Sequence, residues 1–503
     1  MKGPATARIV LLGVFFAAVL GILYWNLHTL ASEPVHVSSL VPEDARFAVV
    51  VRSLNDLGTL FQGPDARADY DPARELVGRP ANIPDLDGVA FDRPVVRMLT
   101  ADNESVQLLP LTAPDAFKQA FDKGITDIQL EAHRIGDYMA LAGRNYRPDR
   151  DAPNGLIVRA LDAYPFAVVV RPTEAGLLRA VLAEALFLKQ ARALPQPVAQ
   201  FIVDECESFL LGLLPPSKRR GTRILVEATL VQGAVSRSAA AAAAHDPAAL
   251  VRSFPLRTLL LGACGLDVPE LQTVAGLVLD ANSAGQLDAS AAVAAGVVET
   301  TAAGRPYALL VLVSTPQTDV LVRALDGLVS KAGGEWEVTQ ADKTPLRTLR
   351  LPREPASLAT LLRSRSAAAP PVYVSTAVQD GVWVCAVGAR ARSLVGEVLI
   401  SLSGKRTMSL GANPIDPTSL PPSEMSERLA ANLAASGLIS RHPEMLDAGH
   451  TAVGMVTLTG LKAVGLDMPK SALPVLSRPL GLTFVFDGPD PGGTARLELR
   501  LSR

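Results

Sequence analysis

One short stretch of the chain concentrates the side chains that are best able to bind a metal ion or to move a proton. Its members are His442, Glu444, Asp447 and His450. A zinc site needs three or four such ligands on fixed elements. The two histidines are eight positions apart, however, whereas ligands four positions apart share one face of a helix. Pro443 and Gly449 also interrupt a helix here. We therefore interpret the stretch as a solvated helix between elements, and these four residues are weak metal candidates only.

Other local signatures of catalysis do not occur in the sequence. Residues 404–407 contain a Gly-Lys pair, but the upstream glycine of a phosphate-binding loop is missing and Arg406 stands where serine or threonine would bind magnesium. The sequence contains neither a Gly-x-Ser-x-Gly turn nor a His-Glu-x-x-His helix. Catalytic residues that are distant in sequence can still meet in space. The sequence thus predicts no catalytic residue, no cofactor and no metal, and it favours a protein that is not an enzyme.

Composition limits the classes to which the protein can belong. Its 503 residues are enough for two or three domains. Lys and Arg number 48 against 50 Asp and Glu, for a formal net charge of −2, which excludes the strongly basic balance of a dedicated nucleic-acid binder. With 49% hydrophobic and 19% charged residues and a mean hydropathy of +0.25, the chain is expected to fold around a large core.

The N-terminal residues have the pattern of a membrane anchor. Lys2 and Arg8 precede an uncharged run over residues 9–27, which as a helix would span roughly 28 Å, close to the hydrocarbon thickness of a bilayer. The basic flank predicts an N-in orientation, with the remaining chain outside the cytoplasm. We expect a cytoplasmic tip and anchor helix over residues 1–31 and a tether over 32–41. The alternative is a signal peptide cleaved after Ala31.

Three cysteines are too few for a disulfide framework. Cys206 falls in a helix-like stretch over 198–214, Cys264 follows an apolar run, and Cys385 lies in a strand-like run over 382–387. We predict three core thiols. One disulfide with one thiol left over is the alternative, because a compartment outside the cytoplasm permits disulfides.

A strand-like run followed by leucines at helical spacing recurs along the chain. The runs cover residues 46–51, 164–170, 307–313 and 451–456. Each changes from a period of two to a period near 3.6. Residues 482–486 and 495–501 alternate across a Gly- and Pro-rich turn, as an antiparallel hairpin does. The sequence therefore predicts an α+β fold with a mostly antiparallel sheet and packed helices.

The two parts of the chain also resemble each other. Residues 106–114 are similar to 309–316, and residues 137–144 are similar to 380–388. We predict two related α+β lobes over 42–300 and 301–503. A single large α+β domain is the alternative, because strand-then-helix units also recur by chance in such folds.

A family resemblance rests on the same segments. An N-terminal anchor, the run at 41–51 with its Leu-rich continuation, the Pro-Leu-Thr-x-Pro-x-x-Phe motif at 110–117 and the strand-like 136–140 together resemble exported bacterial envelope proteins whose α+β domain has no known function. The resemblance covers about half of the chain. It implies a single-pass protein of the bacterial inner membrane with its bulk in the periplasm, and it carries over no active-site residue.

The sequence leads to two functional hypotheses. The first is a non-enzymatic scaffold or protein-interaction module of the cell envelope, with the membrane contacted through residues 9–27 and with an envelope protein as partner. The second is a carrier or sensor of an apolar ligand such as a lipid, because leucine stripes can line a cavity as well as fill a core. Neither hypothesis involves nucleic acid, and both leave the oligomeric state open.

Overall fold

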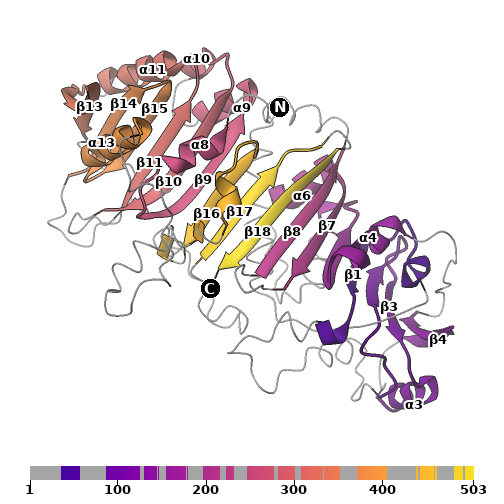
Figure 1. Cartoon of the computed structure of the whole chain (residues 1–503). Coiled ribbons are helices and arrows are strands. Elements are labelled where there is room, and N and C mark those ends of the chain that lie inside the picture. Colours follow the sequence, from indigo (N-terminus) through magenta and orange to yellow (C-terminus); the bar gives the residue numbers. More distant parts are fainter. Residues whose placement is uncertain are drawn as a thin grey trace, which may run out of the picture.

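A computed structural model shows an elongated molecule built on one sheet (Figure 1). It describes residues 36–502 except 57–86, 125–129, 144–145, 147–153, 177, 179–195, 216–221, 232–245, 277–280, 301–306, 332, 342, 352–370, 405–437, 440–441, 458, 461–480 and 491–492. The predicted anchor over 9–27 lies outside the described residues. No helix among the residues it describes is both long and apolar enough to cross a bilayer.

Within the part of the chain that the structure describes, the sheet has 18 strands. They are β1 (Phe47–Val51), β2 (Val95–Leu99), β3 (Ser105–Pro110), β4 (Glu131–Ile135), β5 (Tyr138–Ala142), β6 (Phe166–Val170), β7 (Cys206–Leu214), β8 (Thr222–Leu230), β9 (Thr258–Leu266), β10 (Ala291–Glu299), β11 (Tyr307–Ser314), β12 (Glu337–Ala341), β13 (Thr344–Arg350), β14 (Tyr373–Gln379), β15 (Val382–Gly388), β16 (Ala452–Thr457), β17 (Gly481–Asp487) and β18 (Thr494–Ser502).

Helices lie on both sides of this sheet. Among the described residues, the α-helices are α3 (Pro114–Gly124), α4 (Gly155–Ala163), α6 (Gln196–Glu205), α8 (Pro247–Arg252), α9 (Val268–Ala275), α10 (Ala281–Ala284), α11 (Thr318–Lys331) and α13 (Ala391–Leu402), and the 3-10 helices are η1 (Val37–Leu40) and η5 (Pro443–Leu446).

The strands pair in the spatial order β4-β5-β3-β2-β1-β6-β7-β8-β18-β17-β16-β9-β10-β11-β15-β14-β13-β12. Every pairing between described strands is antiparallel, so the predicted α+β class with a mostly antiparallel sheet is confirmed. At about 4.8 Å per strand the sheet is roughly 80 Å wide. Its two edge strands are β4 and β12.

The same strand order occurs on both sides of the β8–β18 pairing, which we call the seam. Outward from the seam, the first half (36–231) runs β8-β7-β6-β1-β2-β3-β5-β4, and the second half (246–502) runs β18-β17-β16-β9-β10-β11-β15-β14 before it adds β13 and β12. The segments that resemble each other in sequence occupy equivalent places, since β3 corresponds to β11 and β5 to β15. The division expected at residue 300 falls between β10 and β11, which pair over eight residues.

One face of the sheet, the covered face, carries helices in both halves. In the first half α4 packs on β1, β6 and β7, and in the second half α8 packs on β9, β10 and β16 while α13 packs on β13, β14 and β15. Each half buries its own apolar cluster there, around Tyr138 and Ile157 in the first and around Phe254 and Leu310 in the second. On the opposite face, α9 and α11 bury a smaller cluster at one end of β9, β10 and β11.

Local sequence explains several of these element boundaries. The Asn154 side chain accepts hydrogen bonds from the backbone N–H groups of Leu156 and Ile157, which fixes the start of α4. Asp267 and Glu270 form a reciprocal capping box at the start of α9. Asp380 and Gly381 both have positive φ angles, 51° and 74°, and join β14 to β15 in the conformation that favours Asp-Gly in two-residue hairpins.

None of the three cysteines forms a disulfide with another. Cys206 and Cys385 are buried as predicted, whereas Cys264 is only half-buried, and Cys206 lies in a different element from the one predicted. Cys206 is the first residue of β7, because the helix predicted over 198–214 ends at Glu205 and the chain continues as a strand. Burial raises the pKa of the Cys385 thiol to about 12, and the same effect with the nearby Glu205 raises that of Cys206 to about 12. These two thiols therefore stay protonated and unreactive near neutral pH.

Gly454 in β16 and Gly262 in β9 are paired in the sheet but differ in how closely other atoms pack around them. A Cβ atom on Gly454 would clash with the Phe484 ring and with the carbonyl oxygen of Leu261, whereas a Cβ on Gly262, its partner in β9, would have no atom within 4 Å. We expect Gly454→Ala to lower the free energy of unfolding by about 1–3 kcal/mol. Gly262→Ala is the matched control and should leave it unchanged within about 0.5 kcal/mol, measured by chemical denaturation. Equal effects of the two substitutions would contradict the described packing.

Candidate functional site

The predicted candidate residues lie in and around η5, next to the seam. η5 contacts α8 and β17. His442 precedes η5 and is buried, Glu444 lies within η5, Asp447 follows it and is exposed, and His450 is half-buried. Within the part of the chain that the structure describes, no three His, Cys, Asp or Glu side chains are grouped so that they could hold a metal ion. The four residues instead take part in separate contacts.

His442 points into the sheet. Its side chain is 1% exposed, and its Nδ1 lies 2.7 Å from the Thr483 hydroxyl, to which it is hydrogen-bonded. Burial, helped by the positive charge of Arg500, lowers the pKa of His442 to about 4. The imidazole is therefore neutral at physiological pH.

His450 uses both ring nitrogens to hold two segments together. Its Nδ1 lies 2.7 Å from Asp487 Oδ1 at the end of β17, and its Nε2 lies 2.9 Å from the Glu444 carbonyl oxygen in η5. The hydrogen bond to Asp487 raises the pKa of His450 above its ordinary value. With both nitrogens engaged, this ring is a hydrogen-bonding link between η5 and β17.

A buried arginine occupies the centre of the site. The Arg500 side chain is only 5% exposed; its Nη1 donates to Glu444 Oε2 at 2.9 Å and its Nε donates to Glu498 Oε1 at 2.7 Å. Glu444 and Glu498 therefore neutralise the guanidinium on two sides. A buried cation with two such partners is stable, whereas one that loses a partner is strongly destabilising.

The same carboxylates connect the two halves of the molecule. Arg223 on β8 donates through Nε to Glu498 Oε1 on β18 at 2.8 Å, although 275 positions separate the two residues. Farther along the seam, Glu227 on β8 accepts from Arg159 Nη2 on α4 at 2.6 Å and lies 3.5 Å from Arg496 on β18. We call these five residues together with Arg500 and Glu444 the seam cluster.

Hydrogen bonding determines the charge state of the seam carboxylates. Burial alone would raise the pKa of Glu498, but hydrogen bonds from Arg500 and Arg223 outweigh burial and hold that pKa below its usual value. The pKa of Glu444 is lowered in the same way, since a backbone hydrogen bond and the Arg500 side chain outweigh its desolvation. Both groups are therefore ionised at neutral pH and act as fixed counter-charges.

The sequence interpretation expected a solvated helix here. η5 is a short 3-10 helix, but His442 beside it is buried and not solvated, and the interpretation missed the residues that engage η5. Arg500, Glu498 and Arg496 alternate with leucines in β18, so all three charges lie on one face of a strand whose other face is apolar. Such a row in a buried hairpin strand is a signal that the face meets charged partners. Which charged residues these partners are depends on the pairing of β18 with β8, and the local sequence does not specify that pairing.

Comparison of the sequence with models of known protein families finds no match, and comparison with curated protein sequences finds none either. The role of the seam cluster therefore rests on its geometry. Its carboxylates, its guanidinium groups and the two histidines hold η5, α4, β8, β17 and β18 together, and this arrangement can act as a clamp.

The clamp is tested by removing one negative charge. Glu498→Gln keeps the shape of the side chain but leaves Arg223 and Arg500 without their shared carboxylate, so we expect the free energy of unfolding to fall by about 2–4 kcal/mol. The matched control is Glu337→Gln, because Glu337 pairs with Arg392 at the surface, where ion pairs contribute less than about 1 kcal/mol. Chemical denaturation gives both values. A Glu498→Gln variant as stable as Glu337→Gln would refute the clamp.

Acid titration tests the burial of His442. Because its folded pKa lies below the ordinary 6.5, only the unfolded chain takes up this proton as the pH falls from 7 to 5, and stability drops by about 2 kcal/mol. His442→Gln should remove that part of the pH dependence. His450 has a raised folded pKa, so its contribution has the opposite sign, and His450→Gln should make the loss on acidification larger. Unchanged pH profiles in both variants, in denaturation at pH 7 and 5, would exclude this assignment.

Proposed function

We propose that the protein is a scaffold of the bacterial cell envelope that presents its sheet as a rigid platform for another protein. The observation that carries this proposal is the continuous sheet, in which the seam joins two halves through main-chain pairing and buried ion pairs. A sheet roughly 80 Å wide offers much more surface than a standard protein interface of about 800 Å² per partner requires.

We also infer that the two halves arose by duplication of one α+β unit, which gives two related lobes. The equivalent strand orders support this, and so does the place of the seam, where the last strand of each half pairs with its counterpart. An antiparallel pairing of two equivalent edges has the symmetry of an isologous dimer. The hairpin β12–β13 is the addition that extends the second half at its free edge.

The proposed place of the platform is the periplasmic side of the inner membrane, held by residues 9–27. Lys2 and Arg8 on the N-terminal side of this run support an N-in orientation. Nine residues lead from Leu27 to His36, where the described structure begins, and they can span at most roughly 32 Å. The platform would therefore stay close to the membrane surface.

Part of the sheet face opposite the covered face offers apolar contact area. We call it the open face: four side chains on β9, β10, β11 and β15 that lie outside the cluster buried by α9 and α11. They are Leu260, Ala295, Leu309 and Val387, of which Ala295 is exposed and the others are half-buried. Contiguous accessible apolar area commonly marks an interaction site. A partner with an apolar helix or strand face suits this surface.

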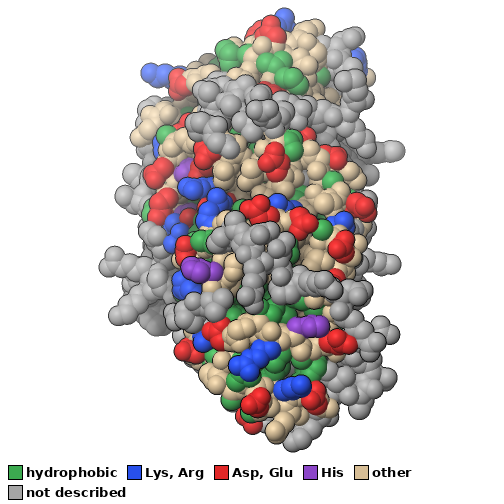
Figure 2. Space-filling model, turned by 90° about the vertical axis from the view of Figure 1, so that its right-hand side faces the viewer, with side chains coloured by type: hydrophobic (Ala, Val, Ile, Leu, Met, Phe, Trp, Pro, Cys, Tyr) green, Lys and Arg blue, Asp and Glu red, His purple; other side chains and the backbone are tan. Residues whose placement is uncertain are grey.

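The charges of the described residues do not favour a nucleic-acid or a strongly charged partner. Figure 2 shows acidic and basic side chains interspersed over the face that it presents. The formal net charge of −2 agrees with this mixture. We therefore favour a scaffold that binds a protein partner through apolar contacts.

Site-specific photo-crosslinking in cells tests the platform. A photoreactive residue at Ala295 should give a discrete adduct with a polypeptide, and the same residue at the exposed Lys118 on α3 should not. An adduct with lipid alone would contradict the scaffold and favour the carrier of an apolar ligand. Absence of any adduct specific to Ala295 would also contradict it.

Membrane fractionation of cells that produce the protein tests the anchor. The full chain should sediment with membranes and resist carbonate extraction, whereas deletion of residues 1–31 should release it, because only the 9–27 run is proposed to enter the bilayer. A deleted chain that stays in the membrane fraction would overturn the anchoring part of the proposal while leaving the crosslinking result interpretable.

A further inference from the structure

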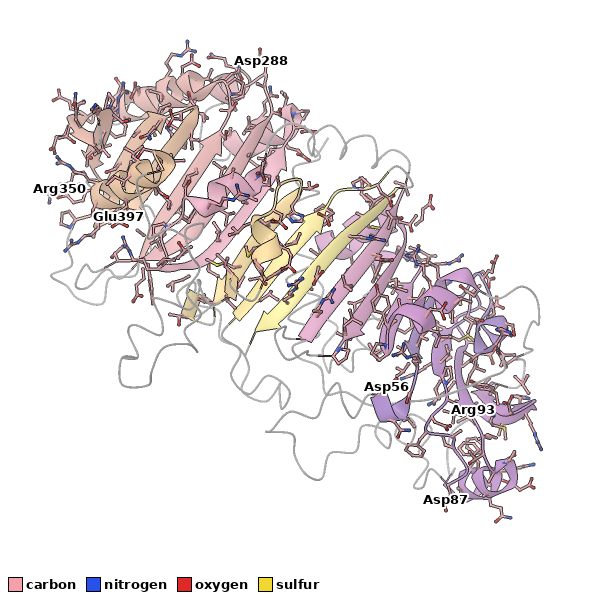
Figure 3. All side chains as sticks on the ribbon, viewed as in Figure 1. Asp56, Asp87, Arg93, Asp288, Arg350 and Glu397 are labelled. Carbon is pink, nitrogen blue, oxygen red and sulfur yellow. The ribbon has the colours of Figure 1, made fainter. Side chains whose placement is uncertain are left out.

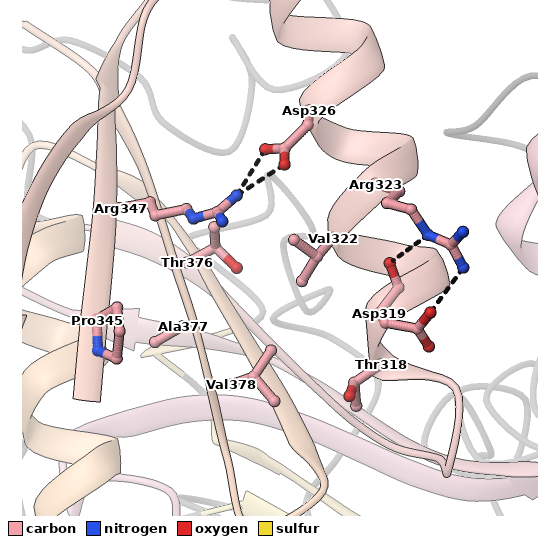
Figure 4. A pocket seen from close by; sticks show the side chains of 10 residues that line it. All are labelled: Thr318, Asp319, Val322, Arg323, Asp326, Pro345, Arg347, Thr376, Ala377 and Val378. Carbon is pink, nitrogen blue, oxygen red and sulfur yellow. Dashed lines mark hydrogen bonds and ion pairs between the residues drawn. The ribbon is translucent and has the colours of Figure 1, made fainter.

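A groove lies between α11 and the outer strands of the second half, on the same side of the sheet as the open face. Its volume is about 460 Å³. Residues of α11 form one wall, and residues of β13 and β14 form the other (Figure 4). α11 packs against β15 and the cluster around Trp383, and its Asp326 reaches Arg347 of β13 across the groove.

An arginine crosses this groove with only part of its hydrogen-bonding capacity used. Arg347 Nη1 donates to both carboxylate oxygens of Asp326 on α11, at 2.9 and 2.7 Å. The Nε and Nη2 groups of Arg347 have no partner among the described residues. Figure 4 shows the guanidinium reaching across from β13 to α11, above Thr376. One edge of the guanidinium, the Nε–Nη2 fork, is therefore available to a ligand.

Asp326 holds the arginine in this position. Besides Arg347, its Oδ1 accepts a hydrogen bond from Trp336 Nε1 at 2.8 Å, so an indole and a guanidinium fix the same carboxylate. The Arg347 and Asp326 side chains are 35% and 40% exposed, so both charges are partly desolvated. A preorganised arginine fork of this kind matches the two oxygens of a carboxylate.

The rest of the groove is mainly apolar. Val322 of α11 faces Pro345 and Val378 of the sheet across it. Next to Arg347 in the sheet register is Val338 on the edge strand β12, which is 60% exposed and extends the apolar surface to the rim. A ligand that enters here meets these apolar side chains beside the Arg347–Asp326 pair, and the Asp319–Arg323 pair also lines the groove.

We propose that this groove binds a single carboxylate attached to a short apolar chain, with the carboxylate on the Nε–Nη2 fork of Arg347 and the chain against Val322 and Val378. The groove also contains Asp319 and Asp326, which balance Arg323 and Arg347 and disfavour a dianion such as phosphate. The ligand is either a free short-chain acid or the C-terminal residue of a polypeptide. The groove is separate from the open face, so this proposal does not depend on the scaffold.

Two probes distinguish the two possible sources of the carboxylate. Octanoate represents a free acid, and a tetrapeptide that ends in valine represents a polypeptide C-terminus, with its C-terminal amide as the uncharged control. Calorimetric titration into the full chain in lipid nanodiscs should show binding of at least one acid. Binding of octanoate alone or of the peptide acid alone identifies the source, and binding of both supports the shared chemistry. If neither binds, or if the peptide amide binds as well as the peptide acid, the proposal is wrong.

Variants connect binding to the groove. Arg347→Gln should weaken binding about tenfold or more, because a charge-assisted pair is lost. Arg350→Gln, on the same strand, does not line the groove, points outward in Figure 3 and should bind as the parent does. Equal weakening in the two variants would refute the assignment. Asp326→Asn should tighten binding about threefold, since the anion that competes for Arg347 is removed.

A second variant, which enlarges a side chain in the groove, tests the proposal if the Arg347→Gln protein does not fold. Val322→Phe fills the groove without altering any charge and should abolish binding. Tryptophan fluorescence checks that α11 stays in place, because Trp336 is hydrogen-bonded to Asp326 of α11 and Trp383 packs in the cluster beneath α11. Retained binding in a folded Val322→Phe protein would overturn the proposed site.

Discussion

The antiparallel pairing of β8 with β18 is the contact on which the rest of the architecture depends. It places Arg223 directly opposite Arg500, an arrangement of like charges that is unfavourable by itself. Glu498 lies one pair farther along the same face and accepts hydrogen bonds from both arginines. The seam is thus held by the antiparallel main-chain ladder between β8 and β18 and by one carboxylate that makes the charge pattern compatible with burial.

The symmetry of this pairing explains where the helices lie. Two equivalent strands that pair in an antiparallel sense are related by a two-fold axis perpendicular to the sheet, so both halves carry their packed helices on the same face. α4 covers the first half and α8 the second, and η5 lies beside the axis, where Glu444 reaches Arg500. The opposite face is left for α9 and α11 at one end, and their limited reach creates both the open face and the groove beside Arg347.

Local patterns in the sequence were sufficient to predict much of the sheet. The runs at 46–51, 164–170, 307–313 and 451–456 are β1, β6, β11 and β16, and the hairpin expected from 482–486 and 495–501 is β17–β18. These predictions succeed because buried strands need β-branched and apolar residues at fixed spacing, and a hairpin needs only a turn between two of them. The similarity of 106–114 to 309–316 likewise corresponds to equivalent strands.

The seam and the site could not be predicted in this way, because they depend on contacts between residues distant in sequence. Arg223 and Glu498 at the seam are 275 positions apart, and the contacts of His442 with Thr483 and of Glu444 with Arg500 span 41 and 56 positions. Nothing in the η5 segment itself shows that His442 is buried against Thr483 or that Glu444 meets Arg500. The groove depends on which strands α11 contacts. These contacts are set by the tertiary structure and cannot be read from the sequence of α11 alone. Local composition identifies charged and apolar rows, whereas the partner of each row follows only from the strand order.

Hydrogen exchange at the seam tests the central claim most directly. If β8 and β18 form the middle of one continuous sheet, the backbone amides of 222–230 and 494–502 should exchange as slowly as those of the neighbouring strands β7 and β17, and Glu498→Gln should accelerate the exchange of both segments together. Fast exchange of either segment in the unmodified protein, alongside slow exchange in β7 and β17, would show two separate sheets and would contradict the account.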